Sequence, residues 1–298
     1  MQEQILFFLQ SIATPFADLI FNIFTMFGED LIIISIIAWI YWNHDKYQGF
    51  ILSFTLISSL VLNNSIKILF RSPRPFQVYP DLIGKRIHTA TGYSFPSGHT
   101  QGAATFYSSL AIIFKKKSLI SAAIVIIIAV ALSRLYLAVH WPVDVIASIL
   151  LGIIFSVILV PYLKKIEKNP VQKMRFILIL NIISVIILVI AIICKILVFK
   201  NELMIVDLIK MTGLLNGISW GYVLDMKKVI FIVNASVKIK ILRFLAGLAG
   251  AFILMEGLKI LLPPLDILQY LRYGMTGFWI VWLYPYLGEK IKLFSHSD

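Results

Sequence analysis

Long apolar runs separated by short charged stretches are the main pattern of this chain. Eight or nine runs are predicted to be membrane-spanning helices: five at about 30–43, 48–70, 96–114, 118–139 and 142–163, and three or four more at about 176–199, 202–225, 243–262 and 266–288. About 20 apolar residues cross the hydrocarbon core of a bilayer as a helix. The pattern therefore predicts an all-α fold, a polytopic membrane helical bundle.

Two segments depart from this pattern. Residues 5–27 are apolar but broken by Pro15 and Asp18, so we expect an interfacial or re-entrant helical hairpin, with a true span as the alternative. Residues 227–243 are too charged to span and are predicted to be a basic amphipathic segment on the membrane surface. The first residues lack the basic start and cleavage site of a secretory signal, so we expect no cleavage there.

The composition agrees with a membrane protein and excludes other classes. Of 298 residues, 59% are hydrophobic and 14% charged, against roughly 45–50% and 25% in soluble domains. The apolar content excludes a disordered chain, and the single Cys194 excludes a disulfide scaffold. The net charge of +12 could indicate nucleic acid, but basic residues flanking apolar runs are typical of topology signals and lipid headgroup contacts. We therefore expect membrane lipids, and no nucleic acid, as partners.

The distribution of basic residues predicts the orientation. One set of loops, together with the C-terminal tail, carries 16 of the 27 Lys and Arg residues: Lys46, Lys115, Lys116, Lys117, Lys164, Lys165, Lys168, Lys173, Arg175, Lys227, Lys228, Lys238, Lys240, Arg243, Lys290 and Lys292. The positive-inside rule places this set in the cytoplasm. The loop at 71–95, the end of the fourth span and the start of the fifth then face outward.

Three polar clusters lie at span ends on that outer face. They are Lys67 with Arg74-Pro75, Pro96-Ser97-Gly98-His99, and Ser133-Arg134 with His140 and Asp144. Because consecutive spans run in opposite directions, the end of one span and the start of the next lie on the same side of the membrane. The first cluster lies at the end of the second span, the second at the start of the third, and the third runs from the end of the fourth into the start of the fifth. All three clusters therefore share one membrane depth.

The first and third clusters carry cations suited to phosphate. Lys67, Arg74 and Arg134 lie near a low-dielectric wall, where a charge is costly unless an anion or a carboxylate meets it. An Arg guanidinium matches phosphate oxygens bidentately, whereas Lys acts as a point charge.

The second cluster is predicted to start a helix. Pro96 suits the first turn, where its missing N–H would be unpaired anyway. Ser97 and Gly98 would present free backbone N–H groups at the positive end of the helix, and Gly98 would let a ligand approach closely. The cations and this helix start together predict a phosphate-binding site.

The two histidines are candidates for acid–base and nucleophilic chemistry. Pro142 is expected to start the fifth helix, which puts Asp144 in its first turn. The carboxylate can then accept one ring N–H of His140 and leave the other nitrogen free to attack. His99 is left to donate a proton to the leaving alkoxide.

Each residue taken singly has an ordinary structural explanation. A lone histidine at the membrane interface usually packs or caps, Ser97-Gly98 alone would be a turn, and Lys67 and Arg134 could be snorkelling anchors. Asp144 alone could offset a helix dipole. The occurrence of all of them in order and at one depth favours a site.

The three clusters resemble the signature of the type 2 phosphatidic acid phosphatase superfamily, KxxxxxxRP, PSGH and SRxxxxxHxxxD, with every fixed position present between residues 67 and 144. The resemblance implies a metal-independent phosphatase with no cofactor and a phosphohistidine intermediate. It implies His140 as nucleophile, Asp144 as its orienting partner and His99 as general acid. The implied phosphate-binding residues are Lys67, Arg74, Ser97, Gly98 and Arg134.

The resemblance also implies a six-helix phosphatase core, followed here by about three additional transmembrane helices. We therefore expect an N-terminal segment at 1–28, the core at 29–200 and the additional helices at 201–298. The extra length resembles a longer branch of the superfamily, which includes sphingosine-phosphate phosphatases. The surplus helices could form a homodimer interface.

The expected activity is hydrolysis of a lipid phosphate monoester or diphosphate, with the active site outside a bacterial cytoplasmic membrane. A phosphotransferase is the first alternative, because water and a lipid hydroxyl would compete for the same phosphohistidine. A non-enzymatic anion or lipid transporter is the second. It is less favoured, since a translocation path has no need of a paired His and Asp.

Overall fold

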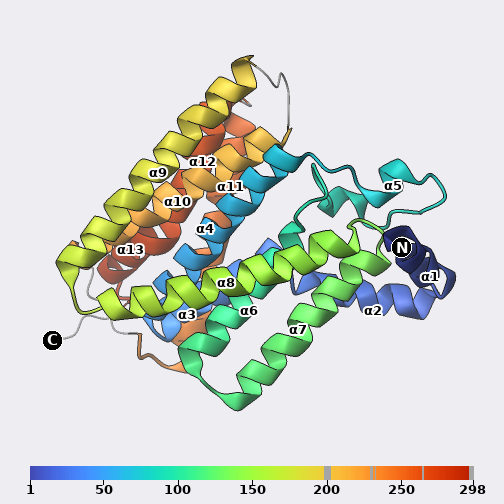
Figure 1. Ribbon diagram of the computed structural model, residues 1–298. Helices are drawn as coiled ribbons and strands as arrows, with labels where there is room; N and C mark the ends of the chain where they lie inside the picture. The colour runs from blue at the N-terminus through green and yellow to red at the C-terminus, as the bar shows by residue number, and fades with distance from the viewer. Residues whose placement is uncertain (198–202, 229–230, 232, 264, 295–298) are drawn as a thin grey trace. The chain divides into compact units, whose positions relative to one another are not determined.

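The computed structural model describes residues 1–197, 203–228, 231, 233–263 and 265–294 (Figure 1). Its helices are α1 (Gln2–Ser11), α2 (Pro15–Met26), α3 (Asp30–Asn43), α4 (Lys46–Phe70), α5 (Pro75–Val78), α6 (Gly98–Phe114), α7 (Lys117–Tyr136), α8 (Pro142–Ile166), α9 (Pro170–Leu197), α10 (Leu203–Lys228), α11 (Val237–Leu261), α12 (Asp266–Phe278) and α13 (Tyr284–Lys290). A 3₁₀ turn at Ile87–Thr89 and a π-helical turn at Trp279–Leu283 complete the regular structure. The predicted all-α class is confirmed for the described residues.

The helices belong to two compact units. The first comprises residues 1–33 and 58–161, and the second comprises residues 34–57 and 162–298. All eight predicted site residues belong to the first unit. The predicted division at residues 28 and 200 stays a prediction, and the second of these boundaries lies outside the described residues.

Within the described residues, fewer helices are long and apolar enough to span a membrane than the eight or nine predicted. Five of them qualify alone, at Lys46–Val78, Lys117–Tyr136, Pro142–Ile166, Pro170–Leu197 and Val237–Leu261, and a sixth if α2 and α3, bent by 43°, are taken together. Helices α3 and α6, with 14 and 17 residues, fall short of the usual length of about 20. The last predicted span is divided between α12, the π turn and α13.

The two segments outside the spanning pattern, residues 5–27 and 227–243, both contain helical structure. Residues 5–27 fall into two helices of 10 and 12 residues, each too short to cross a bilayer alone at about 1.5 Å per residue. The prediction of a separate surface segment at 227–243 is wrong in its second half. Ser236 caps α11, so residues 237–243 are the first turns of that long helix. Residues 229, 230 and 232 of the segment lie outside the described part.

In the first unit, α6 packs against α7 (Figure 1). Small and polar side chains hold α4 and α8 against α6. Asn63 of α4 donates to the Gln101 side chain over 2.8 Å. Ser156 of α8 donates to the Thr105 carbonyl over 2.9 Å. A Cβ on Gly152 would lie 2.7 Å from Ala104 Cβ, so α8 and α6 are close because this position has no side chain. Such contacts are typical of helix pairs in membranes.

In the second unit, α10 packs closely on α12. A Cβ on Gly217 would lie only 1.9 Å from the Gly274 carbonyl oxygen, so the two backbones touch. Two ion pairs of this half have the i,i+3 spacing that places both partners on one helical face: Lys210 reaches Asp207 over 2.8 Å and Lys259 reaches Glu256 over 3.1 Å.

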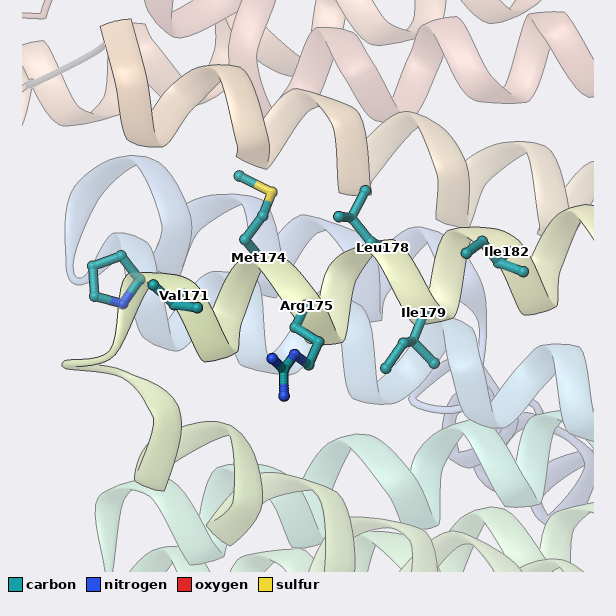
Figure 2. A pocket seen from close by; sticks show the side chains of 7 residues that line it. Val171, Met174, Arg175, Leu178, Ile179 and Ile182 are labelled. Carbon is teal, nitrogen blue, oxygen red and sulfur yellow. The ribbon is translucent and has the colours of Figure 1, made fainter.

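A shallow groove of about 510 Å³ runs along α9 in the second unit (Figure 2). Its lining is almost entirely apolar, with Val171, Met174, Leu178, Ile179 and Ile182 beside a single Arg175. None of the predicted site residues lines it. Apolar side chains exposed along a helix of 28 residues are the expected surface of a membrane span.

Candidate active site

Arg74 lies at the centre of the site and is almost fully buried, with 2% of its surface exposed. Its guanidinium donates to three backbone carbonyls at 2.7–2.8 Å, those of Thr91, Gly92 and Val139. This joins the loop before α6 to the connection between α7 and α8. Lys67, in the last turn of α4, is also buried, and its Nζ donates to the Tyr93 carbonyl over 2.5 Å.

The Pro-Ser-Gly-His cluster forms the start of α6, with one correction. Ser97 is the N-cap and its hydroxyl accepts from the Thr100 N–H, so the helix begins at Gly98. Pro96 therefore precedes the helix and is not in its first turn as predicted. A Cβ on Gly98 would meet only the Asn63 side chain, at 3.8 Å, so there is space beside the first N–H groups of the helix.

His140 lies in the short connection between α7 and α8, and Asp144 lies in the first turn of α8. The predicted contact between them is present, with 3.4 Å between Nδ1 and Oδ2. The same Oδ2 accepts from the Trp141 N–H over 2.8 Å and from the Ser94 hydroxyl over 2.5 Å. Both members of the pair are buried.

The neighbours of His140 determine which ring nitrogen carries the proton. Its Nε2 lies 3.2 Å from Arg74 Nη1. A guanidinium has only donors, so Nε2 must accept there, and the proton is on Nδ1, which faces the Asp144 carboxylate. The imidazole is thus held with its Nε2 lone pair on the side of the cations.

Burial and the positive charges of Arg74, Lys67 and Arg134 hold the pKa of His140 well below its ordinary value, and His99 acts in the same direction. These four groups come from all three sequence clusters. Direct contacts bring the clusters together: Arg74 Nη1 lies 3.2 Å from His140 Nε2, and the Ser97 N–H donates to the Asp144 carbonyl over 3.5 Å. The lowered pKa of His140 keeps its free ring neutral at ordinary pH.

Arg134, in the last turn of α7, is completely buried. Its Nη1 donates to the Thr25 hydroxyl over 2.9 Å. Its Nε and Nη2 are buried with no hydrogen-bond partner among the described residues, and the same holds for His99 Nε2. Unpaired buried donors are uncommon, and here they lie in the one region where an anion is expected.

Two cations of the loop before α6 are paired with carboxylates of the N-terminal residues. Lys85 pairs with Asp18, and Arg86 pairs with Glu29 over 2.5 Å. The Lys85 N–H also donates to the Leu137 carbonyl over 2.9 Å. This loop is therefore anchored both to the first helices and to the end of α7.

Sequence reasoning missed Ser94 and Thr25, whose hydroxyls contact Asp144 and Arg134. Ser94 lies three residues before Ser97 in a loop, and Thr25 is a hydroxyl within an apolar helix. Only the fold brings them to their partners, so the sequence offered no spacing signal for either.

In the described part of the chain, no group of three or more His, Cys, Asp or Glu side chains could hold a metal ion. Metal-independent chemistry stays a prediction.

Two family models match the chain. Residues 48–168 match the PAP2 superfamily, and residues 209–296 match the PAP2 superfamily phosphatase, transmembrane extension. The first range contains all eight predicted site residues, and the second contains most of α10, α11, α12 and α13.

Similar proteins include the undecaprenyl-diphosphatase BcrC of Bacillus subtilis, 31% identical over 42% of this chain and 63% of the relative. Phosphatidylglycerophosphatase B of Haemophilus influenzae is 27% identical over 39% of this chain and 65% of the relative. The crystal structure of a PAP2-type phosphatidylglycerolphosphate phosphatase from Bacillus subtilis is 26% identical, with a TM-score of 0.48, over 55% of this chain and 85% of that one. The chain spans 63% and 65% of the lengths of the first two relatives, somewhat under two thirds of each. Residues 48–168 are thus a PAP2 superfamily domain, and residues 209–296 are a PAP2 transmembrane extension.

Proposed function

We propose that this chain, with its PAP2 superfamily domain, is an integral-membrane lipid phosphatase that hydrolyses a phosphate monoester or diphosphate through a phosphohistidine intermediate. The observation that carries the proposal is the placement of the His140 ring. Its Nδ1 faces Asp144, its Nε2 faces Arg74, and the charges of Lys67 and Arg134 act on it.

In the first step, the lone pair of His140 Nε2 attacks phosphorus and forms a P–N bond, and the P–O bond to the lipid leaving group breaks. His99 gives a proton to the departing oxygen, so the lipid leaves as an alcohol when the substrate is a monoester, or as a lipid monophosphate when it is a diphosphate. The ring becomes cationic as it is phosphorylated, and Asp144 stabilises this charge through the Nδ1 proton.

In the second step, water attacks the phosphorus and the P–N bond breaks, so inorganic phosphate leaves and His140 returns to its neutral form. His99 accepts the proton that the water loses. Throughout, Lys67, Arg74, Arg134 and the N–H groups at the start of α6 neutralise charge on the phosphoryl oxygens.

The proposed location is the outer face of a bacterial cytoplasmic membrane. The asymmetry of basic residues supports it, because the loops joined to the site carry few lysines and arginines compared with the opposite set. The substrate tail would lie among apolar helix faces, with its phosphate at the ends of α4, α6 and α7.

The names of the relatives suggest which lipids to test first. One is called an undecaprenyl-diphosphatase and another a phosphatidylglycerophosphatase. Polyprenyl diphosphates and phosphatidylglycerol phosphate are therefore the first substrates to offer, beside phosphatidate and a sphingoid-base phosphate.

The test is phosphate release by the purified full chain in detergent micelles. We expect release from at least one of these lipids, its loss in His140→Ala, and normal release in His44→Ala, since His44 is an exposed histidine remote in sequence from all three clusters. An added acceptor lipid that receives the phosphoryl group would instead indicate a transferase. Lipid transport that survives in His140→Ala without any hydrolysis in the wild type would contradict the proposal.

A further inference from the structure

Helix α2 presents one face to α7. Asp18, Phe21 and Thr25 follow at intervals of three and four residues, the spacing that places side chains on one side of a helix. Asp18 accepts a 2.6 Å hydrogen bond from the Tyr136 hydroxyl, and the Phe21 ring stacks on the Tyr136 ring with centroids 4.1 Å apart. The N-terminal part of this face, with Asp18 and Phe21, therefore packs against Tyr136 at the end of α7.

The C-terminal part of the face, with Thr25, reaches the candidate active site. Thr25 and Arg134 are both completely buried, and Arg134 Nη1 donates to Thr25 Oγ1 over 2.9 Å. Gly28 lies three residues after Thr25, in the turn that follows α2. A Cβ on Gly28 would lie 2.9 Å from the His99 carbonyl oxygen and 2.8 Å from Val130 Cγ1. The turn after α2 thus lies against the backbone of His99, and Thr25 in the last turn of α2 contacts Arg134.

The two arginines of the site differ in what their donors do. The Arg74 guanidinium is occupied by backbone carbonyls on Nε, Nη1 and Nη2. In Arg134, Nη1 is held by Thr25, whereas Nε and Nη2 have no partner among the residues described. Those two N–H groups form one edge of the guanidinium plane, the edge that binds two oxygens of a phosphate in parallel.

We propose that Thr25 is a positioning residue that holds the free edge of the Arg134 guanidinium toward the phosphoryl group. An arginine side chain loses rotamer entropy when it binds a ligand. The hydrogen bond from Nη1 to Thr25 fixes the side chain before phosphate binds, so less of that entropy is lost on binding. Helix α2 lies outside residues 48–168, so a helix beyond the matched PAP2 range completes the phosphate site.

The proposal rests on the proposed phosphatase function, and its test separates the two. The informative variant is Thr25→Val, which keeps the shape of the side chain and removes the acceptor. Thr25→Ser keeps the hydroxyl and should rescue. The matched control is Thr55→Val, because Thr55 is equally buried and its hydroxyl has no hydrogen-bond partner within the described residues.

The probe is orthovanadate, a phosphoryl mimic, and its binding is measured by the rise of the unfolding temperature of the full chain in micelles. A hydrogen bond to a charged group corresponds to about a tenfold change in affinity. We expect vanadate to bind about tenfold more weakly to Thr25→Val, and within twofold of wild type to Thr25→Ser and Thr55→Val. If Thr25→Val does not fold, Thr25→Ala replaces it, with the same expectation.

A double-mutant comparison shows whether Thr25 acts through Arg134. In an Arg134→Ala background, Thr25→Val should change vanadate affinity by less than twofold, because the group it positions is gone. Wild-type affinity in Thr25→Val, or an equal loss with and without Arg134, would overturn the inference. A wild-type chain that neither releases phosphate nor binds vanadate would instead refute the proposed function.

Discussion

Ser94 offers the sharpest test of how the nucleophile is oriented. Its hydroxyl is fully buried, donates to Asp144 Oδ2 over 2.5 Å, and lies 3.4 Å from His140 Nδ1. Ser94→Ala removes this donor and leaves the backbone and the charge of the site unchanged. The Asp144 carboxylate would then be free to rotate away from the ring that it orients.

The magnitude follows from the donors that remain on the carboxylate. A hydrogen bond to a charged group is worth about 1.5–3 kcal/mol. Oδ2 keeps the Trp141 N–H and the His140 ring in the variant, so the lower figure applies. If the bond is fully expressed in the transition state, about 1.5 kcal/mol corresponds to a kcat about tenfold lower. KM should change less than twofold, because Ser94 does not touch the phosphate cations.

The assay is steady-state phosphate release in micelles by Ser94→Ala and by Ser148→Ala. Ser148 is a matched control, since it is equally buried but donates over 2.6 Å to the backbone carbonyl of Asp144 and not to its carboxylate. Its removal should leave kcat within twofold of wild type. A normal kcat in Ser94→Ala, or the same decrease in both variants, would refute this account of the carboxylate.

Four further outcomes are expected. The acidic limb of the kcat/KM profile should lie below pH 6.5, because the pKa of His140 is lowered and its free ring stays unprotonated down to that pH. An acidic limb above pH 6.5 that arises from protonation of His140 would contradict this. Asp144→Asn should lower kcat by at least about tenfold with little change in KM, and an unchanged kcat would remove Asp144 from the mechanism. Activity should persist in EDTA, and a loss that added metal restores would argue against a metal-independent reaction. Gly217→Ala should lower the unfolding temperature, since its Cβ would overlap the Gly274 carbonyl, and an unchanged melting curve would contradict the close packing of α10 on α12.

The arrangement of the site could be predicted from sequence because it depends on local signals. Helix ends fix where Lys67, Arg134 and Asp144 lie, and alternating span direction places those ends together. The spacing of four residues brings His140, just before α8, against Asp144 in the first turn of that helix. The i,i+3 ion pairs at Asp207 and Glu256 were predictable for the same reason.

Features that depend on tertiary packing could not be predicted in this way. Ser94 and Thr25 reach the site from a loop and from a helix whose approach no spacing rule encodes. Pro96 was misplaced because Ser97 proved the better N-cap, as its hydroxyl accepts from the Thr100 N–H. Hydropathy likewise predicted a continuous span where Trp279–Leu283 forms a π-helical turn between α12 and α13.

The central claim is that His140 becomes covalently phosphorylated during turnover. Its most direct test is to mix the full chain with a lipid substrate labelled in its terminal phosphate, stop the reaction within the first turnover under alkaline conditions that preserve phosphohistidine, and map the label by mass spectrometry. The account predicts phosphate on the peptide that contains His140, and none in His140→Ala. Turnover with the label on a different side chain, or labelling that persists in His140→Ala, would contradict it.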